Sequence, residues 1–408
     1  MSLLSFEDAL LQLLDGARPL SEVDSLPTFA AAGRVLAASL ASAIDVPPLD
    51  NSSMDGYAVR CADIPAPGVR LTVAQRIPAG SVGHSLAPGT AARIFTGAAI
   101  PAGADAVVMQ ELCAQGEDGR IIVNHVPQTG DWIRRAGQDI RAGAEVLARG
   151  DRLSPAQLGL GASVGFAALP VHRRLRVGLF STGDELVMPG EVAPEALPPG
   201  AIYNSNRYLL RGLLEQLGCE IGDLGIVPDS LAATREALRL AAVSHDLILT
   251  SGGVSVGEED HVKPAVQKEG ALELWKIAMK PGRPLAFGHI RKEGGECAFI
   301  GLPGNPVSSF VTFVMLVRPF ILKAQGALRL IPAALRMRAD FDWTHPDARR
   351  EFLRARRNQA GGLELFPNQG SGVLTSVAWA DGLIDNPPGQ AITCGDTVSF
   401  LPFSELLY

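Results

Sequence analysis

The sequence predicts a multidomain chain that combines α/β and all-β parts, with a largely parallel sheet in its central region. Residues 175–325 alternate apolar strands with amphipathic helices, which is typical of parallel strands joined by crossover helices. Short alternating runs, separated by proline and glycine, lie on both sides of that region and indicate β domains. The length of 408 residues fits roughly two to four domains.

The N-terminal region is predicted to be helical and to be interrupted by a β insert. Residues 5–14 place leucines on one broad helical face, and residues 29–40 form a second predicted helix. Ser154 and Pro155 open another helix, which we expect to pack on the first two. The predicted units are a helical linking domain from residues 1–45 and 141–174, and a β insert domain from residues 46–140.

The central and C-terminal parts are predicted as an α/β domain and a small β domain. Strands are expected at residues 175–181, 220–227 and 246–250, with helices between them and a last helix that begins at Pro306. After Pro332 the apolar runs become short and alternating, which is typical of a small β-barrel or sandwich. The predicted boundaries are residues 175–326 for the molecule's α/β domain and residues 327–408 for a C-terminal β-barrel.

Composition argues against several classes of protein. Lys and Arg total 36 against 43 for Asp and Glu, and the resulting net charge of −7 argues against a nucleic-acid partner. The five cysteines are scattered, which favours a reducing cytoplasm over a disulfide framework. The longest apolar run, residues 310–317, is shorter than the ~20 residues that span a bilayer. We expect a soluble cytoplasmic protein without a membrane or nucleic-acid partner.

Glycine-rich turns follow several predicted strands of the α/β region, at residues 179–185, 249–257 and 300–306. Parallel strands end at one edge of a sheet, where open α/β folds bind ligands. Glycines there allow backbone N–H groups to approach a phosphate. Each turn alone is explained by ordinary turn preferences, but three together favour a site for a phosphorylated ligand.

Carboxylates accompany these turns and are candidates for binding a magnesium ion. Glu185 and Asp260 follow two of the turns, and Asp229 lies just after a third predicted strand. Oxygen ligands beside a phosphate are what Mg²⁺ requires, although acidic residues also stabilise helix N-termini. The chain has neither a P-loop motif nor an H-E-x-x-H motif, which disfavours a P-loop ATPase and a zinc hydrolase.

A predicted strand over residues 275–280 carries two lysines on one face. Lys276 and Lys280 alternate with the apolar residues Trp275, Ile277 and Met279. In a regular strand the two lysine Cα atoms would lie about 13 Å apart, so an anion site needs long side chains or a bend at residues 281–282. The alternative is an ordinary half-solvated strand.

An ordered set of motifs resembles the MoeA family of molybdopterin molybdenumtransferases, which includes the gephyrin E domain. The β insert supplies Asp50-Asn-Ser-Ser-Met-Asp-Gly-Tyr-Ala58 and Phe95-Thr-Gly97, loops that turn chemistry alone would also explain. The α/β region supplies Ser181-Thr-Gly-Asp-Glu-Leu186, Ser251-Gly-Gly-Val-Ser-Val-Gly257, Lys280-Pro-Gly-Arg-Pro284 and Gly301-Leu-Pro-Gly-Asn-Pro-Val-Ser308. Each motif is weakly specific, but the set in this order is strongly specific.

The resemblance implies an elongated homodimer that builds the molybdenum cofactor. Its active site would lie between the α/β and C-terminal domains of one subunit and the β insert of the other. The implied reaction takes adenylylated molybdopterin and molybdate, inserts molybdenum at the pterin dithiolate and releases AMP, with Mg²⁺ required. Molybdopterin adenylyltransferase and molybdoenzyme maturation proteins are the implied partners.

The resemblance also implies roles for individual residues. Glu185, Asp229 and Asp260 would bind Mg²⁺ or position the adenylyl group, and Lys276, Lys280, Arg354 and Ser371 would form the molybdate site. Arg354 is chosen among four nearby arginines for its spacing in Arg-Glu-Phe-Leu-Arg. The remaining predicted substrate contacts are Ser251, Gly252, Gly253, Pro303 and Pro306 in the α/β turns, and Asp55, Thr96 and Asp139 in the insert.

Two other functions compete with this interpretation. A molybdopterin adenylyltransferase shares the α/β domain and its Ser-Gly-Gly turn, but it does not account for the insert, the C-terminal domain or the lysine strand. A scaffold without catalysis, as in gephyrin, is the alternative from another class. The chain has no fused second catalytic domain and no long linker, which favours the enzyme.

Overall fold

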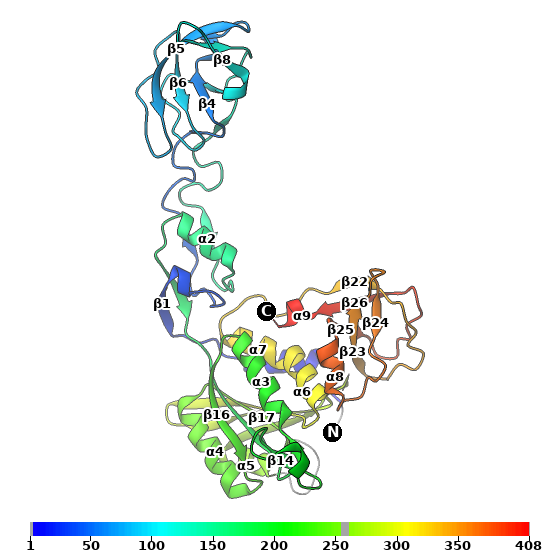
Figure 1. The fold of residues 1–408 in the computed structure, drawn as a ribbon. Helices are drawn as coiled ribbons and strands as arrows, with labels where there is room; N and C mark the ends of the chain where they lie inside the picture. The colour runs from blue at the N-terminus through cyan, green and yellow to red at the C-terminus, as the bar shows by residue number, and fades with distance from the viewer. Residues whose placement is uncertain (1–2, 254–260, 408) are drawn as a thin grey trace.

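The computed structural model describes residues 3–253 and 261–407. Figure 1 shows an elongated molecule with a β domain at one end, a narrow stalk, and the α/β and C-terminal parts side by side at the other end. The helix α1 (Phe6–Gly16) lies with this last group rather than with the stalk.

The stalk is made of short strand pairs and a single helix. The strand β1 (Val23–Pro27) pairs with β12 (Ala168–His172), β2 (Leu40–Ala41) pairs with β11 (Glu145–Leu147), and the helix α2 (Pro155–Ser163) packs beside them. The prediction of a helix over residues 29–40 is wrong, because only the 3₁₀ turn η1 (Thr28–Ala30) forms there. Gly33 adopts φ +73°, which breaks a helix, and Val35 and Leu36 instead make bridges to Arg152 and Val171.

This stalk also corrects the expected packing of the N-terminal helices. The helix α1 packs on the α/β and C-terminal parts: Phe6 contacts Phe352 edge to face, and the Lys323 ammonium donates to the Leu14 carbonyl. The helix α2 shares its small core with Leu36, Leu147 and other stalk residues. The N-terminal region is therefore not one helical unit, because the apolar face of α1 is buried elsewhere.

The β insert forms one six-stranded sheet in the order β7-β4-β6-β5-β9-β8. The strands β5 and β6 run parallel, while β4 is antiparallel to both β6 and β7. The short pair β3–β10 closes the end of the domain that carries the Asp50–Gly56 loop. The insert elements are β3 (Asn51–Ser52), β4 (Gly56–Val59), η2 (Cys61–Asp63), β5 (Val69–Ile77), β6 (Thr90–Ile94), β7 (Ala106–Met109), η3 (Gln110–Leu112), β8 (Cys113–Gln115), β9 (Ile121–Val123) and β10 (Ile133–Arg134).

The α/β part contains a mixed six-stranded sheet in the order β16-β13-β17-β21-β20-β18. The strands β16, β13, β17 and β21 are parallel to one another. The strand β20 runs antiparallel to both of its neighbours, β21 and β18, so β18 has the same direction as the four parallel strands. One face packs on α4 and α5, and the other packs on α1, α3, α6 and α7. The strands of this sheet are β13 (Arg176–Thr182), β16 (Glu220–Val227), β17 (Leu247–Ser251), β18 (Gly270–Lys276), β20 (Pro284–Lys292) and β21 (Gly295–Leu302). A separate short pair is formed by β14 (Leu186–Val187) and β15 (Ile202–Tyr203). The helices are η4 (Pro194–Ala196), α3 (Ser205–Gln216), α4 (Leu231–Ser244) and α5 (Val262–Glu269).

A long apolar helix fills the space between the sheet and the C-terminal domain. It runs through α6 (Pro306–Thr312), a π-helical turn η5 (Phe313–Val317) and α7 (Arg318–Ala324). By length and hydropathy this 19-residue helix could cross a membrane, but 94% of its most apolar window is buried inside the protein. Its apolar character is thus explained by its position in the core.

The C-terminal part is a second mixed sheet, in the order β19-β23-β25-β26-β22 with β24 on β23. An isolated bridge joins Ala339, which follows β22, to Leu363 in β24. This bridge is too short to form a continuous strand pair, so the closed barrel remains a prediction. The strand β19 (Met279–Lys280) belongs to the α/β chain segment but pairs with β23, which ties the two domains together. The other elements are β22 (Leu335–Arg338), β23 (Arg350–Arg357), β24 (Leu363–Leu365), α8 (Leu374–Trp379), β25 (Gly382–Asn386), β26 (Thr397–Pro402) and α9 (Phe403–Leu406).

Candidate active site

A cavity of about 790 Å³ lies at the carboxyl ends of β13, β17 and β21. The glycine-rich turns that follow these parallel strands meet there, as the sequence pattern predicts. A loop of the C-terminal domain contributes Gly372 to its wall. The predicted residues that line it are Glu185, Asp229, Ser251, Gly252, Gly253, Pro303 and Pro306.

Two glycines of the second turn are required by the backbone. Gly252 and Gly253 have φ of +90° and +66°. A Cβ atom on Gly252 would lie 2.8 Å from the Thr182 carbonyl oxygen, and one on Gly253 would lie 2.3 Å from Val262 Cγ2. Any other residue would be strained and would fill the wall of the cavity. Glycine is therefore required at both positions, because the turn packs closely against Thr182 and Val262 at the edge of the cavity.

The candidate carboxylates come from two neighbouring strand ends. Glu185 is exposed, and its carboxylate folds back over Gly183 so that a Cβ there would be 2.5 Å from Oε2. Asp229 is half-buried on the same cavity wall. Asp260 lies outside the described residues, so its predicted role stays a prediction. Within residues 3–253 and 261–407, no group of three metal-ligating side chains comes together.

The lysine strand is split between two sheets. Trp275, Ile277 and Met279 are buried, while Lys276 and Lys280 are only half-buried, which confirms the predicted alternation. Lys276 ends β18 in the α/β sheet, whereas Lys280 lies in β19 of the C-terminal sheet. The prediction of one strand over residues 275–280 is therefore wrong: the chain bends at Ala278, and β18 and β19 lie on the two sides of the domain boundary.

The two lysines differ in their surroundings. The Lys280 ammonium lies 3.2 Å from Glu351 Oε1 and 3.5 Å from Asp347 Oδ2. Glu351 is fully buried and also accepts hydrogen bonds from Trp343 Nε1 at 2.8 Å and Asn386 Nδ2 at 3.4 Å. Lys276 makes no side-chain hydrogen bond or ion pair within the described part of the chain. Sequence analysis missed Glu351, because its strand position carries no signal for a contact with residue 280.

Arg354 donates a hydrogen bond to the C-terminal loop that borders the cavity. Its side chain is 1% exposed, and its guanidinium donates to the hydroxyl of Ser376 and to the carbonyls of Phe352 and Gly370. Burial lowers the pKa of Arg354 to about 10. Next in the loop, the Ser371 carbonyl accepts a hydrogen bond from the Val307 N–H at the start of α6. A direct contact of Arg354 or Ser371 with molybdate stays a prediction.

The insert residues lie at the other end of the molecule from this cavity (Figure 1). Asp55 Oδ1 accepts hydrogen bonds from the Thr96 N–H and hydroxyl, both at 2.8 Å. These bonds, and more weakly the Arg93 guanidinium, hold the pKa of Asp55 below its ordinary value. Asp139 is exposed near the base of the insert. One chain therefore brings Asp55 and Thr96 together but leaves them away from its own cavity.

Two asparagines at the start of α3 belong to the cavity and were missed. Asn206 Nδ2 donates to the Gly304 carbonyl at 2.7 Å, and Asn204 caps the helix by accepting from the Arg207 N–H. Both side chains are buried in the cavity wall. They could have been predicted from the segment Tyr203-Asn-Ser-Asn206, which is an N-cap pattern just after a short strand.

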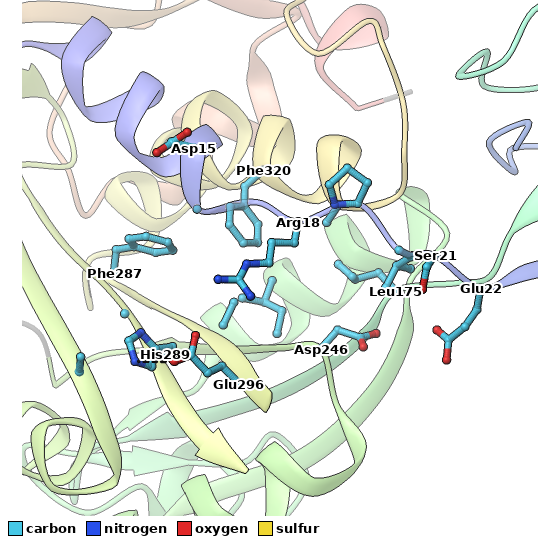
Figure 2. A pocket seen from close by; sticks show the side chains of 18 of the residues that line it. Asp15, Arg18, Ser21, Glu22, Leu175, Asp246, Phe287, His289, Glu296 and Phe320 are labelled. Carbon is cyan, nitrogen blue, oxygen red and sulfur yellow. Dashed lines mark ion pairs between the residues drawn. The ribbon is translucent and has the colours of Figure 1, made fainter. Parts of the chain in front are cut away.

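A second cavity of about 490 Å³ lies at the opposite edge of the α/β sheet. Figure 2 shows Arg18 extending into it from the segment that follows α1. Arg173 donates to both Glu22 and Asp246 there, and His289 lies 3.2 Å from Glu296. The Arg173 pairs join the stalk to the α/β domain, whereas His289 and Glu296 lie on the neighbouring strands β20 and β21. The cavity adds no group to the candidate active site.

Comparison with known proteins places this architecture in a class of molybdopterin-binding proteins. Family models match along the chain: the MoeA N-terminal region (domain I and II) at residues 4–165, the probable molybdopterin binding domain at residues 178–323, and the MoeA C-terminal region (domain IV) at residues 336–403. The crystal structure of the molybdopterin biosynthesis moeA protein from Pyrococcus horikoshii matches with a TM-score of 0.85 and 28% identity, over 98% of this chain and all of that one.

Curated relatives make the assignment specific. The molybdopterin molybdenumtransferase of Haemophilus influenzae is 40% identical over 99% of this chain and 100% of its own length. That of a Nostoc species is 36% identical over 93% of this chain and 88% of its own length. The chain belongs to the MoeA family.

Proposed function

We propose that this protein is a molybdopterin molybdenumtransferase of molybdenum cofactor biosynthesis. It takes adenylylated molybdopterin and molybdate, joins molybdenum to the pterin dithiolate and releases AMP. The observation that carries the proposal is the cavity at the strand ends, whose bare glycine turns and flanking carboxylates suit a phosphorylated ligand, in a chain of this family. The names of the relatives do not favour an adenylyltransferase or a scaffold.

The carboxylates suit a magnesium ion at the phosphoanhydride of the substrate. Glu185 and Asp229 offer hard oxygen ligands from adjacent walls of the cavity, and Asp260 would be the third. When bound, Mg²⁺ would neutralise charge on the departing nucleotide. The Gly252 N–H already donates to the Leu302 carbonyl at 3.1 Å, so the Gly253 N–H would be the group of this turn that holds a phosphate.

The lysines suit molybdate, which is a tetrahedral dianion. Lys276 has no competing partner within the described residues, and Lys280 is 39% exposed in spite of its ion pairs. Ammonium groups supply the charge and the hydrogen-bond donors that a dianion needs. Arg354 would contribute by holding the loop that carries Ser371.

The function further implies a homodimer. Asp55, Thr96 and Asp139 match family site residues. Asp55 precedes β4 and Thr96 follows β6, in the β insert that lies at the other end of the molecule from the α/β domain (Figure 1). A second copy that places its insert over the cavity would complete the site. We place the enzyme in the cytoplasm, where a molybdopterin adenylyltransferase supplies its substrate and maturation proteins of molybdoenzymes take its product.

Variants of Asp229, which lines the cavity, and of Lys276, which ends β18, test this proposal. Asp229→Asn and Lys276→Met should each lower molybdate-dependent AMP release at least tenfold, while circular dichroism and sedimentation remain as in the wild type. Lys268→Met, which changes an exposed lysine of α5, is the matched control and should retain full turnover. Wild-type turnover in both Asp229→Asn and Lys276→Met would contradict the proposal.

A further inference from the structure

A cluster of cationic and aromatic side chains lies on the sheet of the β insert. Arg76 on β5 and Arg93 on β6 are direct partners in the parallel register, and Tyr57 on β4 is the partner of Arg93 on the other side. Phe95 follows β6 immediately. The guanidinium carbons of Arg76 and Arg93 each lie 4.6 Å from the centroid of the Phe95 ring. The two cations therefore converge on one ring.

No carboxylate lies in ion-pair contact with either Arg76 or Arg93 among the described residues, although the more distant Asp55 feels the charge of Arg93. Arg93 donates to the Gly56 carbonyl and to Gln110 Oε1, so it is partly occupied. Arg76 is exposed, and its contact with Phe95 is the only interaction recorded for its side chain among the described residues. Like charges on paired strands repel, so their convergence needs a reason beyond folding.

Stacking on an aromatic ring prepares a guanidinium to bind an anion. A guanidinium that lies over a ring is held in place, while its N–H groups point outward in a planar fork that matches two oxygens of a phosphate. The cluster adjoins Thr96, whose N–H and hydroxyl bind Asp55, so it sits directly beside the predicted insert residues. This end of the insert therefore presents arginine side chains whose geometry suits a phosphate.

We propose that Arg76 and Arg93, stacked on Phe95, form a phosphate-binding platform for the nucleotide phosphate of the substrate. This inference rests on the proposed function, in which the insert of one subunit covers the cavity of the other. The glycine turns then hold the phosphates from one wall, and the platform neutralises their charge from the opposite wall. Arg76 is the residue whose loss tests the platform most directly, because the Phe95 ring is its one side-chain contact within residues 3–253 and 261–407.

Binding of AMP and adenosine to the full-length protein tests the platform, since the two probes differ only in the phosphate. Arg76→Gln should weaken AMP binding about tenfold in calorimetry, as expected for loss of one charge-assisted contact, and should leave adenosine binding unchanged. Arg93→Lys, which keeps the charge but not the fork, should weaken AMP binding less. The AMP affinity of Arg76→Gln should also depend less on salt.

The matched control is Arg70→Gln, which removes another exposed arginine from the same strand. Arg70 pairs with Asp118 at 3.3 Å, so its charge is already compensated, and AMP binding should not change. Equal AMP affinity in Arg76→Gln and the wild type would overturn the platform even if the enzyme turns over normally. Conversely, weaker AMP binding in Arg76→Gln in a protein that releases no AMP would support the platform and contradict the proposed function.

Discussion

Removal of the Lys280 ammonium is predicted to destabilise the protein because it leaves Glu351 buried without its cation. The Glu351 side chain is 1% exposed, and the Lys280 Nζ to Glu351 Oε1 distance is 3.2 Å. At an effective dielectric constant of about 20, the Coulomb attraction at that distance is about 5 kcal/mol. Lys280 is 39% exposed, so solvent screens much of this energy and desolvation of Glu351 opposes it.

We expect a net cost of about 2 kcal/mol for Lys280→Met. Glu351→Gln should cost about 1 kcal/mol, because the amide oxygen keeps the hydrogen bonds from Trp343 and Asn386 but the NH2 group then faces the Lys280 ammonium, which keeps Asp347. The double variant should resemble Glu351→Gln. The coupling free energy between positions 280 and 351 is then close in size to the loss of unfolding free energy in Lys280→Met alone.

Urea unfolding of the four proteins, followed by tryptophan fluorescence, measures these differences. The transition that reports the C-terminal domain is the relevant one, because a chain with several domains need not unfold in one step. If Lys280→Met is as stable as the wild type, or if the double variant is as unstable as Lys280→Met, the reasoning is refuted. A loss of activity in Lys280→Met is attributable to molybdate binding only if the stable double variant loses it too.

Further predictions concern pH and thiol reactivity. A hydrogen bond from Arg349 holds the pKa of Asp347 well below its usual range, so this stabilisation is present above pH about 4 and is lost as the pH falls through the lowered pKa. Arg349→Gln should therefore lower the urea midpoint at pH 7, and the difference in midpoint from the wild type should shrink toward pH about 2. A difference that stays constant over this pH range would contradict the role of Arg349. Burial raises the pKa of Cys219 and of Cys297 to about 12, whereas Cys394 is exposed. Iodoacetamide at pH 8 should label Cys394 first in mass spectra of the native protein, and equal labelling of Cys219 would contradict the fold.

The placement of the cavity could be predicted from the sequence because the order of elements determines it. Strands that alternate with helices become parallel, and parallel strands bring their following turns to one edge. This rule alone predicts that Glu185, Asp229 and Ser251 lie at the same edge of the sheet. The alternation of apolar residues with Lys276 and Lys280 likewise predicts which side chains are buried.

The remaining features depend on contacts between distant segments. Nothing in the local pattern of residues 275–280 shows that the strand leaves one sheet and joins another, or that Glu351 meets Lys280 there. The helix expected over residues 29–40 fails because Gly33 adopts a left-handed conformation and the segment pairs with the end of the stalk. The antiparallel direction of β20 follows from the hairpin at residues 293–294, which joins β20 to β21 and turns the chain back.

The central claim is that this cavity transfers molybdenum to a nucleotide-activated pterin. The most direct measurement is AMP release from adenylylated molybdopterin by the purified protein with Mg²⁺, with and without molybdate, together with molybdenum analysis of the pterin product. We expect AMP release that depends on molybdate, with about one molybdenum retained per AMP released, as the transfer stoichiometry requires. Adenylylation of molybdopterin from ATP without such release, or inactivity in both assays, would contradict it.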